Sequence, residues 1–78
     1  MAPALNMAYR VEVRTGQHGT WRPVGYRDTY WQATGLADVF WGEARGQISG
    51  IRVIDQYREN VGAEPIVYSI ERVVGAQA

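Results

Sequence analysis

The run from Thr29 to Gly46 constrains the fold more than any other part of the sequence. Its apolar residues recur at helical spacing and, at about 100° per residue, cover one continuous face. They are Tyr30, Ala33, Leu36, Ala37, Phe40, Trp41 and Ala44. Thr29 stands at the N-cap position with Gln32 three residues later, which is the capping-box pattern. Arg45 suits the last turn and Gly46 the position after it, so we predict one amphipathic helix that must cover an apolar surface.

Segments with strand patterns lie on both sides of this helix. Tyr9–Arg14 strictly alternates apolar and charged residues, which predicts a strand with one buried face. Ile51–Tyr57 and Ile66–Val73 predict two more strands, separated by a loop at Arg58–Pro65. Trp21–Arg27 is either a further strand that completes a hairpin or an irregular segment. Because Pro23 lies in it and has no N–H to donate, such a strand belongs at a sheet edge.

The element order β(β)αββ predicts an α+β fold, with one helix packed on a small antiparallel sheet of three or four strands. A crossover through the helix makes the strand at Tyr9–Arg14 a neighbour of the strand at Ile51–Tyr57. We expect one domain over residues 1–78, with loose tails at 1–7 and 75–78. The expected inward-facing residues are Tyr9, Val11, Val13, Leu36, Phe40, Ile51, Val53, Ile66, Tyr68 and Ile70.

Composition excludes several classes of protein. The eight basic residues are all Arg and are balanced by eight acidic ones, so the net charge is zero, whereas nucleic-acid binders are usually strongly basic. There is no Cys for a disulfide scaffold or a Cys-based zinc site. No apolar run approaches the roughly 20 residues of a membrane helix, and no secretory signal is recognisable. We expect a protein of the host-cell cytoplasm with no membrane association.

Catalytic groups do not converge in the sequence. His18 lies in a glycine-flanked turn, and neither Ser49 nor Ser69 has a base nearby in sequence. Asp38 and Glu43 are five residues apart, about 140° around a helix, so their carboxylates diverge. We therefore predict that the protein is not an enzyme, with no catalytic residue, no bound metal and no cofactor.

The sheet face away from the helix should carry arginines, as an Arg-based binder of single-stranded nucleic acid would. Its expected residues are Arg10, Glu12, Arg14, Arg52, Ile54, Gln56, Val67, Ser69 and Glu71. Acidic residues interrupt the arginines, and Tyr9 and Tyr68 face inward, which removes the stacking surface. Nucleic-acid binding is therefore the alternative function, beside a structural subunit of a larger assembly.

The outward side of the helix carries an unusual stripe. Trp31, Gly35, Asp38, Gly42 and Arg45 follow each other at spacings of four and three, which places them on one side. Each glycine inside a helix costs about 1 kcal/mol relative to Ala, and Trp is enriched at binding hot spots. The stripe therefore predicts a protein-docking surface, for another protein or for a second copy. We add to it the acidic residues Glu43, Asp55, Glu59 and Glu64.

The whole-chain plan resembles the small anti-CRISPR proteins of phages and other mobile elements. The likeness rests on the strand Tyr9–Arg14, the helix Thr29–Arg45, the two later strands, the small size, the absence of Cys and the aromatic and acidic surface residues. It involves no sequence motif. It implies an inhibitor that binds a type I CRISPR surveillance complex (Cascade) and blocks target-DNA engagement by occlusion. The zero net charge favours a local contact or steric block over overall DNA mimicry.

Overall fold

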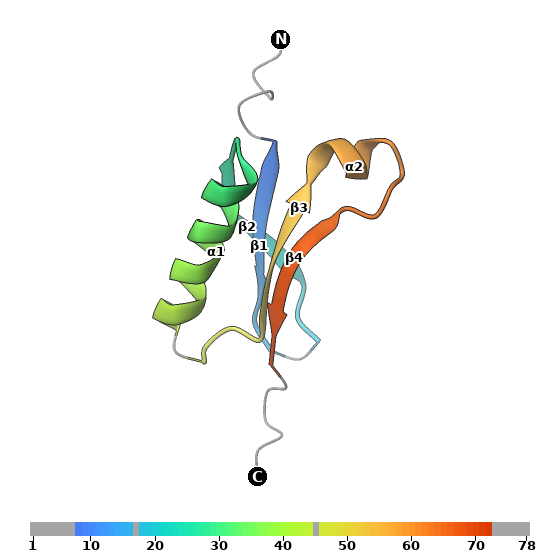
Figure 1. The fold of residues 1–78 in the computed structure, drawn as a ribbon. Coiled ribbons are helices and arrows are strands. Elements are labelled where there is room, and N and C mark those ends of the chain that lie inside the picture. The colour runs from blue at the N-terminus through green and yellow to red at the C-terminus, as the bar shows by residue number, and fades with distance from the viewer. Residues whose placement is uncertain (1–7, 17, 45, 73–78) are drawn as a thin grey trace.

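A computed structural model describes residues 8–16, 18–44 and 46–72 and shows the predicted α+β fold. Figure 1 shows one main helix lying on one face of a four-stranded sheet. The strands are β1 (Tyr9–Arg14), β2 (Trp21–Arg27), β3 (Gly50–Asp55) and β4 (Ile66–Glu71); the helices are α1 (Tyr30–Ala44) and α2 (Gln56–Asn60). The expected tails at 1–7 and 75–78 lie outside the described residues.

The sheet is antiparallel throughout, with the strand order β2-β1-β3-β4. The strands β1 and β3 are neighbours, as predicted, and Val11 lies opposite Val53. The uncertain segment Trp21–Arg27 is a strand and occupies one sheet edge. Pro23 lies in it, next to the register shift between Val11 and Glu12, so the missing N–H is tolerated at this edge.

Helix α1 begins where the capping pattern predicted. The backbone N–H of Gln32 donates to the Thr29 hydroxyl at 3.1 Å, which satisfies one of the unpaired donors of the first turn. At the other end, Gly46 has a φ of 90°, a left-handed conformation that favours glycine and stops the helix. The helix packs on β1, β2 and β3. The buried cluster between the helix and the sheet contains Val11, Ala33, Ala37, Ile48, Ile51 and Val53.

The segment after β3 differs from the prediction. The expected strand through Tyr57 ends at Asp55, and Gln56 starts the short helix α2. The Asp55 carboxylate accepts hydrogen bonds from the backbone N–H groups of Tyr57 and Arg58, at 3.0 and 3.2 Å. This N-cap turns the chain out of the sheet, so the expected loop at Arg58–Pro65 is partly helical.

A register shift between β3 and β4 also changes which residues form the core. It falls between Val53 and Ile54, so that Ile66 lies opposite Ile54, on the face away from α1. Ile66 was predicted to face inward but is exposed, and Val67, predicted to face outward, packs against the core. Ile54 lies on the outer face as expected, yet it is only 2% exposed. Because side chains alternate along a strand, one irregularity reverses the pattern on one side of it.

Candidate protein-docking face

Helix α1 carries an exposed stripe that we call the α1 stripe, consisting of Trp31, Gly35, Asp38 and Gly42. The Trp31 side chain is 79% exposed. A Cβ atom added at Gly35 or Gly42 would meet nothing within 4 Å. No close contact among the described residues therefore requires glycine at these two positions. The helix backbone there is open to an approaching surface. Val39, beside the stripe, is also exposed. Arg45, predicted to end the stripe, lies outside the described residues.

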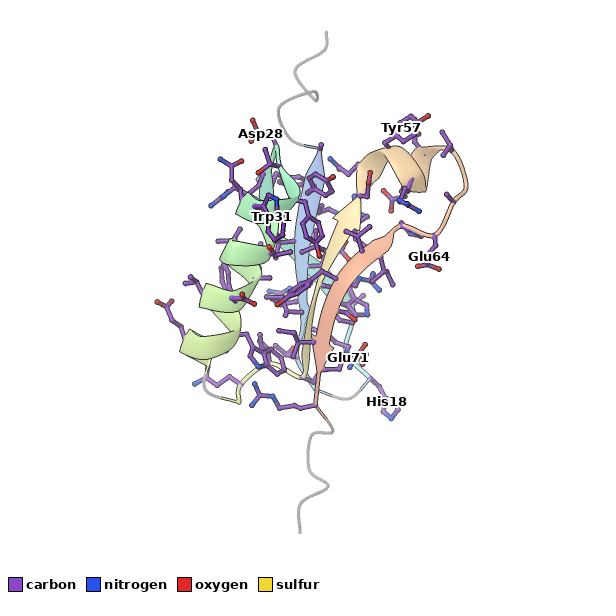
Figure 2. The ribbon with its side chains drawn as sticks, in the orientation of Figure 1. His18, Asp28, Trp31, Tyr57, Glu64 and Glu71 are labelled. Atoms are coloured by element: carbon purple, nitrogen blue, oxygen red, sulfur yellow. The ribbon has the colours of Figure 1, made fainter. Side chains whose placement is uncertain are left out.

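Aromatic contacts position Trp31 at the start of the helix. Its indole meets the ring of Tyr30 edge to face, with centroids 5.3 Å apart. Tyr30 in turn packs edge to face against Tyr9 of β1 at 6.3 Å, and Figure 2 shows Trp31 at the amino-terminal end of α1. Edge-to-face pairs of this kind are favourable by about 0.5–1.5 kcal/mol. The indole is thus supported on one side by the core-facing aromatics while most of its surface meets solvent.

Asp38 links the α1 stripe to the sheet. The hydroxyl of Tyr68 in β4 donates a hydrogen bond of 2.5 Å to Asp38 Oδ1. The hydrogen bond to this carboxylate, together with burial, raises the pKa of Tyr68 to about 12. Asp38 is therefore engaged within the chain, and the bond shows that the stripe lies on the β4 side of the helix.

The β4 strand is the least covered part of the sheet beneath α1. The helix packs mainly on the other three strands, and both Tyr68 and Ile70 are only half-buried. At the carboxyl end of the helix, the guanidinium of Arg72 lies 4.0 Å from the centroid of the Trp41 ring. The α1 stripe therefore borders the helix-facing side of β4, which it contacts through the hydrogen bond between Tyr68 and Asp38.

The structure does not bring three of the other predicted acidic residues, Asp55, Glu59 and Glu64, to this surface. Asp55 caps α2 and Glu64 accepts from the Ile66 N–H, so both carboxylates are used locally. Glu59 pairs with Arg10 through two bonds of 3.2 and 2.8 Å, on the opposite face of the sheet from α1. This hydrogen bond with Arg10 lowers the pKa of Glu59 and raises that of Arg10. Glu43 lies on α1 and is exposed.

The face opposite α1 is a network of paired charges. Glu12 is only 7% exposed and accepts from Arg10 at 2.8 Å and from Arg52 at 2.7 Å. Arg14 is paired with Glu71 at 3.1 Å and also donates to the Ser49 hydroxyl. Glu12 and Arg52 lie directly opposite each other in β1 and β3, which is the cross-strand Arg–Glu pairing that the alternating sequence favours, whereas the Arg10–Glu12 pair is within β1. The three arginines are therefore partly neutralised by partners within the chain.

Trp21 is a residue of this face that the sequence analysis did not place there. The guanidinium carbons of Arg14 and Arg52 lie 4.8 and 4.2 Å from its ring centroid. Its pairing with Arg14 in the β1–β2 register puts both side chains on the outer face. The alternation of β1 places Arg14 on the outer face. Only the register between β1 and β2, which sets Trp21 opposite Arg14, places Trp21 there too.

Within the described residues, no group of three or more His, Cys, Asp or Glu side chains could hold a metal ion. Neither of the two helices there has the length and apolar character needed to cross a membrane. Comparison with models of protein families, with curated proteins and with solved structures gave no match.

Proposed function

We propose that the chain is a non-enzymatic protein-binding module whose contact surface is the α1 stripe. The observation that carries the proposal is the 79% exposed indole of Trp31 on the same side of the helix as Gly35 and Gly42. Each glycine destabilises the helix by about 1 kcal/mol without providing a contact among the described residues. A partner backbone that approaches the helix closely would explain both glycines, and an exposed indole is a typical hot-spot anchor.

The partner that the resemblance implies is a type I CRISPR surveillance complex in the host cytoplasm. In this proposal the module binds that complex stoichiometrically and occludes the route of target DNA. The balanced net charge and the locally paired carboxylates of Asp55, Glu59 and Glu64 support a steric block rather than mimicry of DNA phosphates. Glu43, exposed on α1, is then the acidic residue best placed to contact the partner.

The test measures binding of the purified chain to a purified type I complex, together with target-DNA binding by that complex. Trp31→Ala should weaken binding by about 2 kcal/mol or more, roughly thirtyfold, because it truncates the anchor. Gly35→Leu combined with Gly42→Leu should abolish binding by steric overlap while the helix stays folded. Tyr57→Ala is the matched control, because Tyr57 is an exposed aromatic on α2, outside the stripe.

Two outcomes would overturn the proposal. If Trp31→Ala binds as tightly as Tyr57→Ala and the unmodified chain, the α1 stripe is not the contact surface. If the unmodified chain neither binds the complex nor affects its DNA binding, this target class is wrong.

The second candidate is an Arg-based binder of single-stranded nucleic acid, which the stacking of Arg14 and Arg52 on Trp21 favours. Against it, both guanidiniums already pair with carboxylates of Glu71 and Glu12. Fluorescence anisotropy with random oligonucleotides at low and moderate salt separates the candidates. Tight binding that weakens steeply with salt and is lost in Trp21→Ala would favour this second function.

A further inference from the structure

The apolar side chains that the structure leaves exposed gather at one end of the sheet. There β1 and β4 begin, β2 and β3 end and α1 starts, and we call it the α1-start end. Figure 2 shows Trp31 and Tyr57 toward this end, whereas His18 and Glu71 lie toward the other. Apart from Val39, the exposed large apolar residues of the described chain all lie there: Tyr26, Trp31, Tyr57, Val61 and Ile66. Trp31 is the most exposed of them, so this end lacks cover above all at its indole.

The chain enters the sheet at this same end. Tyr9, the first residue of β1, lies opposite Arg27, the last residue of β2, just before α1 starts. Pairing with the neighbouring segment continues one residue beyond β1, because the N–H of Gln56 donates to the carbonyl of Ala8 at 3.0 Å. Residues 1–7, which lie outside the described structure, are therefore attached beside the exposed apolar side chains.

The composition of these seven residues suits an apolar surface. They contain no charged side chain, and Asn6 is the one polar residue among them. The side chain of Tyr9 packs on the α1 side of the sheet. Because successive side chains of an extended chain point to opposite sides, an extended continuation sets Met7 and Leu5 on the α1 side as well. Two large aliphatic side chains are thereby directed toward the start of α1.

From this arrangement we infer that residues 1–7 fold over the indole of Trp31, with Met7 and Leu5 packed against its ring. The two edge-to-face contacts that connect Trp31 to Tyr9 place their ring centroids no more than about 12 Å apart, and seven extended residues reach about 23–25 Å. A methionine sulfur also makes favourable contacts with aromatic rings. The segment thus has both the reach and the side chains to cover the indole.

The tether makes the chain's own segment, rather than a second copy, the occupant of this surface. A short tether gives the segment an effective concentration in the millimolar range, so that even a weak contact populates the covered state. A second copy would need a comparable protein concentration to compete with it. The contact is therefore intramolecular and does not depend on dilution.

This contact gives the α1 stripe a competitor within the chain, a role that rests on the proposed function. A partner that anchors on Trp31 must first displace residues 1–7. Its apparent dissociation constant is then the intrinsic constant divided by the fraction of molecules in which the indole is uncovered. The intramolecular contact itself needs no partner, so the two statements can be tested separately.

The first test is NMR spectroscopy of the isolated, isotopically labelled chain. We expect nuclear Overhauser contacts between the Met7 methyl group and the Trp31 indole. Leu5→Ser combined with Met7→Ser should shift the indole N–H signal of Trp31, because it removes the apolar cover. The control, Ala2→Ser combined with Ala4→Ser, changes side chains on the opposite side of an extended segment and should leave that signal in place.

Two results of this test would overturn the inference. One is the absence of contacts between Met7 and Trp31, or an equal shift of the Trp31 signal in the control. The other is a Trp31 signal that moves when the unmodified chain is diluted, because a second copy would then be the occupant. All replaced residues precede the described structure, so a loss of the fold does not confuse the outcome.

The second test measures binding of the same variants to a purified type I complex. Leu5→Ser combined with Met7→Ser should bind at least about threefold more tightly, which corresponds to an indole covered in two thirds of the molecules. The control should bind like the unmodified chain. An NMR contact without a gain in affinity refutes the competition. If the NMR contact is present but no variant binds the complex, the proposed function fails and the intramolecular contact stands.

Discussion

Replacing the two glycines of the α1 stripe by alanine should stabilise the isolated protein. The space is open, since a Cβ at Gly35 or Gly42 meets nothing within 4 Å, and neither glycine has a positive φ. Each replacement restores about 1 kcal/mol of helix propensity. The positions are seven residues apart, about 10 Å along the helix, so the effects should add to about 2 kcal/mol. For a domain of this size, that corresponds to a rise in Tm of about 8–16 °C.

The assay is thermal and urea unfolding followed by circular dichroism, for each single variant and for the double variant. Gly19→Ala is the contrasting control, because its Cβ would lie 2.0 Å from the carbonyl oxygen of Thr15 and should therefore lower stability. A double variant that is no more stable than the unmodified chain would refute the reasoning. It would mean that a part of the chain packs against these glycines, and that their presence needs no external partner.

Three further predictions concern stability and titration. Glu12→Ala should lower the free energy of unfolding by about 3 kcal/mol in a urea titration, because it leaves Arg10 and Arg52 without their shared, buried carboxylate. Its control is Glu43→Ala, at an exposed position, which should change the free energy of unfolding by less than about 0.5 kcal/mol. Thr29→Ala should lower the free energy of unfolding by about 1 kcal/mol, measured as a lower Tm, because the N-cap bond to Gln32 is lost. Thr20→Ala, at an exposed position before β2, is its control, and an equal fall in Tm for both variants would contradict the assigned N-cap. Since its pKa is raised from 10.0 to about 12, Tyr68 contributes stability that is complete below about pH 10 and is lost as the pH rises toward 12. Asp38→Asn should lower the pKa of Tyr68 in an NMR titration of the tyrosine ring. An unchanged pKa would contradict the assigned hydrogen bond between Tyr68 and Asp38.

Much of the fold could be predicted because its signals are local. The alternation of Tyr9–Arg14 and the helical spacing after Thr29 each require only a short window of sequence. A capping threonine and a glycine in the left-handed conformation then fix where α1 begins and ends. The strand at Trp21–Arg27 stayed open because Pro23 is compatible with an edge strand and with an irregular segment. Only the pairing with β1 decides between them.

The registers between strands could not be predicted, because they depend on contacts between segments that are far apart in the sequence. The register shifts beside Glu12 and Ile54 result from how neighbouring strands fit. The shift beside Ile54 exchanges the roles of Ile66 and Val67. Asp55 could have been recognised as an N-cap, because the helix-compatible residues of Gln56–Asn60 follow it directly. The alternating pattern before it instead favoured extending the strand.

For the candidate site, the sequence by itself determined that Trp31, Gly35, Asp38 and Gly42 share one side of a helix, because helical periodicity is a property of the backbone. Only the tertiary structure decided that this side faces β4, through the bond from Tyr68 to Asp38. The packing also separated the stripe from Asp55, Glu59 and Glu64, which serve α2 and its surroundings. Periodicity fixes directions around one element, whereas the neighbour that an element meets depends on how the whole chain packs.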